Sequence, residues 1–162
     1  MITSSMASDS SASVMLGLGS YAPELRLTNE ELCQRIDTSD EWIVSRTGIR
    51  ERRIASKDET TSDLALAAAR NALADGGIAP EEIDLVVVAT ITPDMAFPST
   101  ACRLQHKLGL GNVCCFDLEA ACSGFVYALD VADGLLQSGR YHKALVVGAE
   151  KLSSIIDWED RS

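Results

Sequence analysis

The sequence predicts an α/β protein with a mostly parallel sheet. Its 162 residues fit one domain, and 46% hydrophobic with 23% charged residues is ordinary for a folded globular core. Continuous β-branched runs, the clearest being Asp84–Ile91 and Lys143–Ala149, are typical of strands buried on both faces. Segments with helical spacing of apolar residues separate these runs. This alternation of strands and helices favours a parallel sheet.

The chain begins with a segment that we expect to lie outside the fold. Residues 1–12 are rich in serine and lack the basic start and apolar centre of a signal peptide, so they are predicted to be a disordered leader. Residues 13–162 are predicted to form one domain. It opens with a short apolar strand at Ser13–Leu18, which runs into Gly17 and Gly19.

Two short helices are predicted next. A capping box at Thr28–Glu31 begins a helix that continues to Ile36. Either Ser39 or Asp40 begins a second helix, around Trp42 and Val44. Arg50–Ala55 is predicted to be a short strand or an extended segment.

The remaining elements alternate regularly. Thr60 or Thr61 caps a helix that runs to about Asp75, and Gly76-Gly77 ends it with the flexible residues that a helix C-terminus prefers. The elements predicted after it are a strand, a helix, a strand, a helix and a strand, at Asp84–Ile91, Pro98–Leu108, Val113–Leu118, Ser123–Gln137 and Lys143–Ala149.

Composition excludes several classes of function. The formal net charge of −10 disfavours nucleic-acid binding, because phosphates would be repelled. The longest apolar run, near Leu85–Ile91, is far short of the ~20 residues that span a bilayer. Five cysteines are an odd number, no C-x-x-C occurs and only two histidines are present, so a disulfide framework and a zinc site are both disfavoured. Reduced thiols in a cytosolic protein fit better.

Gly17–Ala22 matches G-x-G-x-x-A, the dinucleotide-binding fingerprint. That fingerprint must open a helix directly. Here Pro23 and the alternating Leu25 and Leu27 follow, which indicate a loop, and no second strand ends in an acidic residue at the right distance. We therefore favour a glycine-rich turn over a nicotinamide dinucleotide site.

A basic cluster leaves two interpretations open. Four of the 14 basic residues fall close together, at Arg46, Arg50, Arg52 and Arg53, and Trp42 lies one helical turn before the first of them. An indole and guanidinium groups suit a ligand with a flat base and phosphates. The alternative is a solvated face paired with nearby acids and a tryptophan in the core, with Glu51, Asp58 and Glu59 as those acids. Spacing alone favours the alternative.

Cys122 is the sharpest candidate for chemistry. In Asp117–Phe125 a strand ends, small residues make a tight turn, and the cysteine stands at the start of a helix, as in a nucleophile elbow. The partial positive charge of a helix N-terminus stabilises a thiolate. A lone cysteine is, however, usually a small core residue. We interpret the other four as packing residues: Cys33, Cys102, Cys114 and Cys115. His106 and His142 are predicted to lie on the surface, so the nucleophile lacks an evident base.

Several segments together resemble one family, the β-ketoacyl-acyl carrier protein synthase III enzymes. The segments that carry the resemblance are Asp37–Arg53, Thr92–Gln105, Asp117–Phe125 and Ala144–Glu150 with Asp157–Arg161. The resemblance covers nearly the whole chain from about Val14. It implies a thiolase-like fold of two similar halves in a layered αβαβα arrangement, with this chain as the N-terminal half and incomplete at its C-terminal end. It also implies a homodimer. Together with the composition, we expect a cytoplasmic protein that binds no membrane, nucleic acid, metal or permanent cofactor.

The family reaction has two steps. An acyl group moves from coenzyme A to a cysteine, and it then condenses with malonyl-acyl carrier protein as CO₂ leaves. By resemblance, Cys122 is the nucleophile and its backbone N–H forms part of the oxyanion hole. The same comparison assigns coenzyme A contacts to Thr38, Trp42, Arg46 and Arg161, and the acyl pocket of the partner subunit to Phe97.

The family chain is about twice as long as this one, and its catalytic His and Asn lie in the second half. The 162 residues alone are therefore expected to be inactive. Two other functions stay open. The chain could be a non-catalytic remnant that only dimerises or binds a partner, or it could belong with polyketide starter or 3-hydroxy-3-methylglutaryl-CoA synthase relatives.

Overall fold

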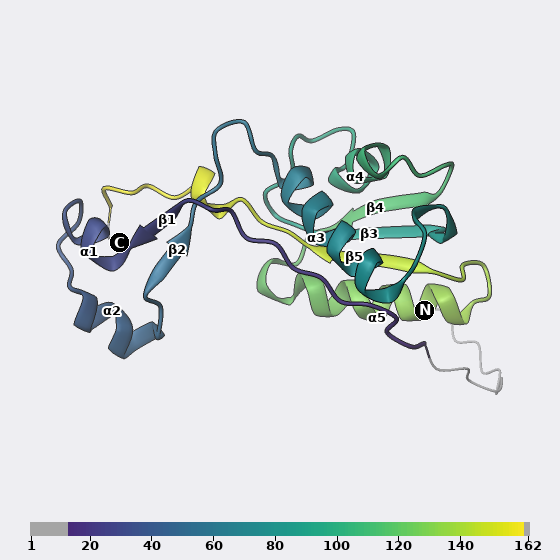
Figure 1. The fold of residues 1–162 in the computed structure, drawn as a ribbon, viewed down its shortest axis with the longest axis horizontal. Helices are drawn as coiled ribbons and strands as arrows, with labels where there is room; N and C mark the ends of the chain where they lie inside the picture. Colours follow the sequence, from purple (N-terminus) through teal and green to yellow (C-terminus); the bar gives the residue numbers. More distant parts are fainter. Residues whose placement is uncertain (1–12, 161–162) are drawn as a thin grey trace, which may run out of the picture.

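The computed structural model describes residues 13–160, which fold into two regions (Figure 1). A larger α/β unit contains the strands β3 to β5 and the helices α3 to α5. A small lobe contains β1, α1, α2 and β2. Three segments of chain, residues 19–25, 54–60 and 149–157, run between the two regions.

The α/β unit is built on a three-stranded parallel sheet in the order β4-β3-β5. The strands are β3 (Leu85–Ala89), β4 (Cys114–Leu118) and β5 (Ala144–Gly148), and Leu85 lies opposite Cys114 on one side and Ala144 on the other. All five residues of β3 are buried. The three central strands and their parallel direction are therefore confirmed.

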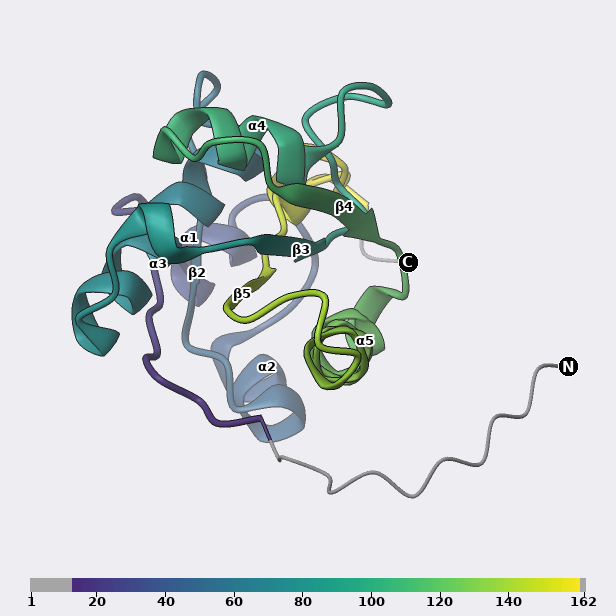
Figure 2. The same ribbon diagram turned by 90° about the vertical axis from the view of Figure 1, so that its right-hand side faces the viewer.

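Helices cover both faces of this sheet (Figure 2). On one face α3 (Thr61–Gly76) and α4 (Thr100–Leu108) pack against Val86 and Val88. On the other face α5 (Gly124–Gln137) packs against the alternate residues of β3. A strand covered on both faces excludes water from every side chain, which explains its unbroken apolar sequence.

The small lobe is an antiparallel strand pair with two short helices. It contains β1 (Arg26–Thr28), α1 (Asn29–Cys33), α2 (Asp40–Thr47) and β2 (Glu51–Arg53). Its core consists of Leu27, Leu32 and Ile43, with Trp158 from the C-terminal segment packed against them. The capping box at Thr28 and the N-cap at Ser39 form as predicted.

Two predictions for this lobe were wrong. The first helix ends at Cys33 instead of Ile36. Leu25–Leu27 was interpreted as loop, yet β1 begins at Arg26, because its partner β2 lies 25 residues away in sequence and leaves no local signal. Single turns of 3₁₀ helix complete the secondary structure at Pro80–Glu82, Ala121–Ser123 and Leu152–Ser154.

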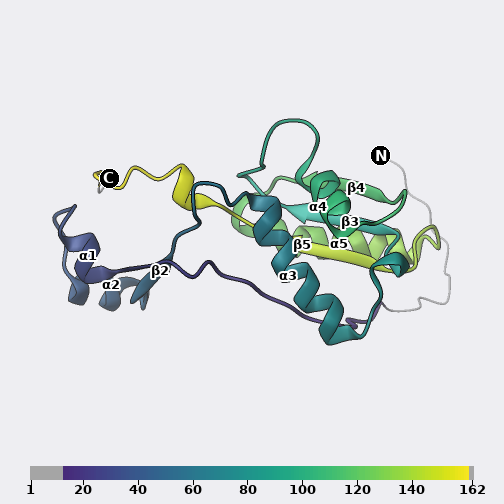
Figure 3. The same cartoon turned by 45° about the horizontal axis from the view of Figure 1, so that its top comes forward.

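The strand predicted at Ser13–Leu18 does not form. This segment instead lies along α3 (Figure 3), where the Leu18 amide donates to Asp75 at 2.9 Å. A Cβ on Gly19 would come within 2.2 Å of the Ala72 amide, so the glycines allow this close contact with the helix. A cavity of about 910 Å³ lies between the segment and β5, and the segment makes no strand pair with β5.

The G-x-G-x-x-A match therefore has a packing role, since no helix follows it among residues 20–23. Among residues 13–160, no helix has both the length and the apolar character needed to cross a membrane. The predicted leader, residues 1–12, lies outside the described part of the chain.

Candidate active site

Cys122 lies exposed in the turn that connects β4 to α5. The turn is a 3₁₀ helix, closed by a hydrogen bond from the Ser123 amide to the Ala120 carbonyl at 3.0 Å, and α5 follows directly at Gly124. Ala121 has a φ of +45°, a left-handed backbone that costs a non-glycine residue on the order of 1–3 kcal/mol. The strained turn presents the thiol at the carboxyl edge of the sheet.

Gly124 lets this turn sit close to the sheet. A Cβ at that position would meet the Ala89 side chain at 3.2 Å. The predicted strand–turn–helix arrangement around Cys122 is therefore present, with a 3₁₀ turn placed between strand and helix.

The other four cysteines differ from Cys122 in environment. They are half-buried within α1, α4 and β4, whereas Cys122 is exposed. Burial raises the pKa of Cys115 to about 11, and neighbouring cysteines add to the effect. That thiol stays protonated at neutral pH, which disfavours it as a nucleophile.

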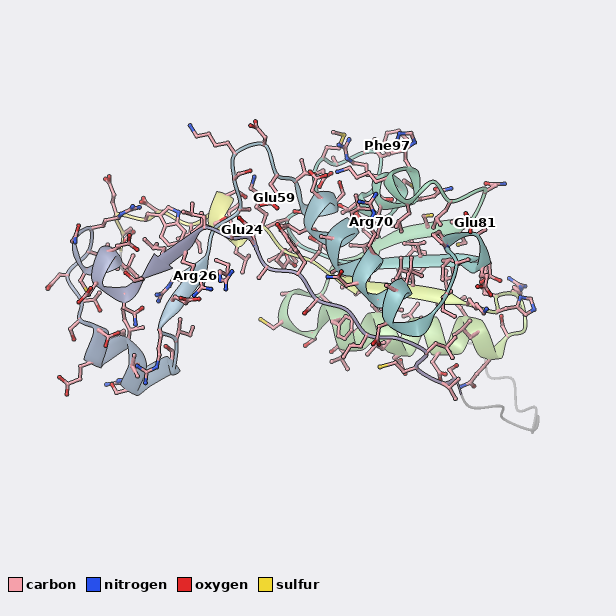
Figure 4. All side chains as sticks on the ribbon, viewed as in Figure 1. Glu24, Arg26, Glu59, Arg70, Glu81 and Phe97 are labelled. Carbon is pink, nitrogen blue, oxygen red and sulfur yellow. The ribbon has the colours of Figure 1, made fainter. Side chains whose placement is uncertain are left out.

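A second loop at the same edge carries Phe97, whose side chain is 86% exposed (Figure 4). Contacts at both ends hold the loop in place. The Asp94 carboxylate accepts from the amide and hydroxyl of Ser62 and from Arg103 Nε at 2.6 Å. The Asp117 carboxylate accepts from the Thr100 and Ala101 amides, both at 2.7 Å. The phenyl ring therefore projects from a fixed base.

The small lobe brings the predicted base-stacking residues together. Trp42 is 45% exposed, and the Arg46 guanidinium carbon lies 5.7 Å from the centre of its ring. Ile43 between them points into the lobe core, so α2 presents the indole and guanidinium outward. Thr38 precedes this helix, and its hydroxyl oxygen is buried with no hydrogen-bond partner among the described residues.

Arg52 and Arg53 of the basic cluster make contacts that hold the lobe together. Arg52 donates to the Asn29 side chain at 2.7 Å, and Arg53 donates to Glu51 and to the Pro23 carbonyl. The interpretation of the cluster as a face paired with acidic residues is thus correct for Arg53, which pairs with Glu51, whereas Arg52 contacts a neutral amide. Its other part, a tryptophan in the core, is wrong because α2 has one apolar side facing inward and Ile43 occupies it.

This chain was compared with protein families, curated proteins and solved structures, and the matches agree with one another. A family model described as 3-oxoacyl-[acyl-carrier-protein] synthase III matches residues 116–162. The chain is 58% identical over 149 residues to β-ketoacyl-[acyl-carrier-protein] synthase III of Bradyrhizobium diazoefficiens, which covers 92% of this chain and 46% of the relative. The crystal structure of 3-oxoacyl-[acyl-carrier-protein] synthase III from Aquifex aeolicus matches with a TM-score of 0.87 and 54% identity, over 90% of this chain and 47% of that one.

Over most of its length, the chain is similar to β-ketoacyl-[acyl-carrier-protein] synthase III proteins. It spans about half the length of the curated relatives it matches. The fold is thiolase-like, and the chain corresponds to the N-terminal half of the family's proteins. A priming β-ketosynthase from the R1128 polyketide pathway is also similar, with a TM-score of 0.88 and 47% identity over 91% of this chain and 44% of that one.

The two histidines lie at the edge of the sheet opposite Cys122. His142 precedes β5, and its backbone amide and ring contact Asp84, which precedes β3. His106 lies near the end of α4, which runs back toward the start of β4. Because the strands are parallel and five residues long, the two edges are separated by about 16 Å. Both histidines are exposed, as predicted, and neither lies near the thiol.

One expected site residue is not described by the structure, and several residues near the site were not predicted from the sequence. Arg161, which the resemblance assigns to coenzyme A, lies outside the described residues. Asp94 and two residues that follow β5, Glu150 and Lys151, were not identified from the sequence. Their side chains contact backbone groups distant in sequence: the Ser62 amide, the Ile91 amide and the Glu59 carbonyl, respectively. An acidic or basic residue just after a strand end was the only available signal.

Proposed function

We propose that this chain forms the cysteine-bearing and coenzyme A-binding part of a β-ketoacyl-acyl carrier protein synthase III, a condensing acyltransferase that starts fatty-acid synthesis. The observation that carries the proposal is the exposed Cys122 in a strained turn at the carboxyl edge of the sheet. Its position agrees with the family resemblance and with nucleophilic chemistry.

In the first step, the Cys122 thiolate attacks the carbonyl carbon of an acyl-CoA. A carbon–sulfur bond forms to the enzyme, the bond to coenzyme A breaks, and coenzyme A leaves as the thiol after taking up a proton. The oxyanion that forms on the way needs positioned donors. The backbone N–H of Cys122 supplies one of them in this proposal.

In the second step, malonyl-acyl carrier protein loses CO₂, and the electron pair left behind forms a carbanion next to the thioester. That carbon attacks the acyl group on Cys122, so a carbon–carbon bond forms and the cysteine leaves as thiolate. The product is a β-ketoacyl-acyl carrier protein. The family's His and Asn stabilise the enolate, and neither His106 nor His142 lies near enough to replace them.

The coenzyme A contacts fall on the small lobe. Adenine stacks on Trp42, and Arg46 beside it binds a phosphate of the nucleotide, with the Thr38 hydroxyl as a further donor. Arg161 is assigned to the adenine side by resemblance. Phe97, on its supported loop, reaches into the acyl pocket of the partner subunit of a homodimer. We further propose a cytoplasmic enzyme with acyl-CoA as substrate and no resident cofactor or metal.

A role as the priming enzyme of a polyketide pathway is the second candidate. The similarity to the R1128 priming ketosynthase supports it, because the same two steps would serve either pathway. Comparing condensation onto malonyl-acyl carrier proteins of fatty-acid and of polyketide type separates the two roles.

Mass spectrometry of the complete protein after incubation with acyl-CoA tests the main proposal. We expect one acyl group on Cys122 and none in Cys122→Ala, with condensation reduced by about 10⁴-fold or more. Cys114→Ala, which changes a half-buried cysteine on the preceding strand, is the matched control and should keep the adduct. An acyl adduct on Cys114, or condensation by Cys122→Ala at the normal rate, would refute the assignment.

Residues 1–162 by themselves should not condense acyl-CoA with malonyl-acyl carrier protein, since positioned donors commonly contribute about 2.7–4 kcal/mol each and those of the second half are missing. A labelled-malonate assay on the purified fragment measures this, and co-expression of the remaining polypeptide should restore turnover. Turnover by the fragment alone would return His106 or His142 to consideration.

A further inference from the structure

Lys151 joins the two regions of the molecule. Its ammonium group donates to three backbone carbonyl oxygens of the segment between the small lobe and α3: those of Ser56 at 2.9 Å, Lys57 at 3.3 Å and Glu59 at 2.6 Å. A lysine ammonium has three donors, so these contacts use all of them. Among residues 13–160, the acceptors of this ammonium are backbone carbonyl oxygens. We call this contact the Lys151 clasp.

The clasp is anchored firmly on the α/β side. Lys151 is the third residue after the end of β5, and its amide donates to the Thr92 hydroxyl at 2.8 Å. The preceding Glu150 carboxylate accepts from the Ile91 amide at 2.9 Å and from the hydroxyls of Thr90 and Thr92. The backbone at the exit of β5 is thus fixed to the loop that follows β3.

On the lobe side, the clasp holds residues 54–60, the segment that leaves the lobe toward α3. Figure 4 shows Glu59 in this connecting segment, between the two regions. The Glu59 carboxylate accepts from the Tyr21 hydroxyl at 3.0 Å and from the Ser56 amide. Residues 19–25 and residues 54–60 are therefore tied to each other and, through the ammonium, to β5.

We propose that Lys151 is a positioning residue that sets where Trp42 and Arg46 stand relative to Cys122. This inference rests on the proposed function. The lobe carries the groups that bind the nucleotide, and the α/β unit carries the thiol, so one acyl-CoA must reach both. If the distance between the two regions is wrong, nucleotide binding no longer delivers the thioester to the thiol, and errors of about 1 Å can cost a large factor in rate.

Lys151→Met in the complete protein tests the proposal. Removal of the charge frees the three carbonyls, so hydrogen exchange at the Ser56 and Glu59 amides should rise about tenfold while exchange in β3 stays unchanged. The KM for acyl-CoA should rise about tenfold. The KM for the matching acyl-pantetheine thioester should not change, because that substrate has no nucleotide and does not use the lobe. Lys151→Arg, which keeps the charge, should recover part of the acyl-CoA effect.

The matched control is Lys57→Met, since the clasp uses only the backbone carbonyl of Lys57. This variant makes the same Lys-to-Met change within residues 54–60, the segment that the clasp holds, and should leave both KM values and the exchange rates as they are. Equal losses with both thioesters in Lys151→Met, or no change in either measurement, would overturn the proposal. If the unmodified enzyme binds both thioesters equally, the coenzyme A site of the proposed function fails, and the exchange measurement still decides whether Lys151 fixes the segment.

Discussion

The two regions of the molecule are stabilised in different ways. The α/β unit has a strand buried on both faces, with apolar layers above and below it. The small lobe has three buried apolar residues, and polar contacts do much of the rest: a capping box at Thr28, the Arg52–Asn29 contact and the Arg53–Glu51 pair. Surface ion pairs contribute only about 0–1 kcal/mol each. The lobe is therefore expected to open more easily than the α/β unit.

This difference matches the division of labour in the proposed reaction. The α/β unit supplies the nucleophile, whose geometry must be exact at the level of the attacking atom. The lobe supplies Trp42 and Arg46, which recognise a part of the substrate that does not react. A region that only binds substrate tolerates local opening, provided that its position relative to Cys122 is maintained. Maintaining that position is the role proposed for the Lys151 clasp.

Core truncation gives the largest expected contrast. Leu104 on α4 is 0% exposed and lies in the main core cluster. Leu104→Ala should lower the free energy of global unfolding by about 2–5 kcal/mol, because it removes buried methylene groups and leaves a cavity. Ile43→Ala in the lobe should cost less globally and should instead raise hydrogen exchange throughout α1 and α2.

Urea unfolding followed by circular dichroism measures the first effect, and residue-resolved hydrogen exchange measures the second. Equal global losses for the two variants would show that lobe and α/β unit unfold as one, which would remove the proposed contrast.

Protonation provides a second contrast. Burial alone would raise the pKa of Asp94, but hydrogen bonds from Ser62 and the nearby Arg103 charge lower it by more, so the pKa lies below its usual range. A depressed carboxylate pKa contributes stability that is present above its unfolded value of about 3.9 and is lost as pH falls toward the folded value. Hydrogen bonds to charged groups contribute about 1.5–3 kcal/mol.

Asp94→Asn should accordingly lower the melting temperature at pH 7 and flatten the decline of melting temperature as the pH falls below about 4. Calorimetry across this range measures it. Asp58→Asn, in the exposed segment beside the lobe, is the control and should change neither quantity. If the melting temperature of Asp94→Asn still declined with falling pH as steeply as that of the unmodified protein, other carboxylates would account for the decline.

The α/β unit and the small lobe also differ in how well their elements could be predicted from the sequence. The strands, helices and parallel sheet of the α/β unit follow from runs such as Asp84–Ile91, because burial on both faces leaves an unambiguous apolar pattern. In the lobe, the caps at Thr28 and Ser39 were predicted, since a cap is a local interaction. β1 was missed because its partner is remote.

The residues of the candidate site also divide into those with a local sequence signal and those without one. Cys122 and its turn were predicted from local sequence, and Trp42 with Arg46 from helical spacing and then from the family resemblance. The contacts of Asp94 and Lys151 could not be predicted, because each joins backbone groups that only the folded chain brings together. The strand predicted at Ser13–Leu18 failed for the converse reason, since its sequence suits a strand but it packs on α3 and pairs with none of the described strands.

The smallest expected effect compares one substitution in both regions. Ser39 caps α2, where its hydroxyl accepts from the Trp42 amide at 3.1 Å, and Ser99 caps α4, where its hydroxyl accepts from the Cys102 amide at 3.2 Å. Loss of an N-cap hydroxyl costs about 0.5–2 kcal/mol of helix stability. At α4 the Asp117 carboxylate also accepts from the first two helical amides, so part of the capping remains when Ser99 is removed.

Ser39→Ala should therefore raise hydrogen exchange in the first turn of α2 by about tenfold, while Ser99→Ala changes α4 much less. Because α2 carries the indole, Ser39→Ala should also weaken coenzyme A binding slightly in calorimetric titration, and Ser99→Ala should not. A larger change in α4 than in α2 would show that the Asp117 carboxylate does not substitute for the serine. The lobe helix would then be the better capped of the two, and the order of stability argued for the two regions would have to be reversed.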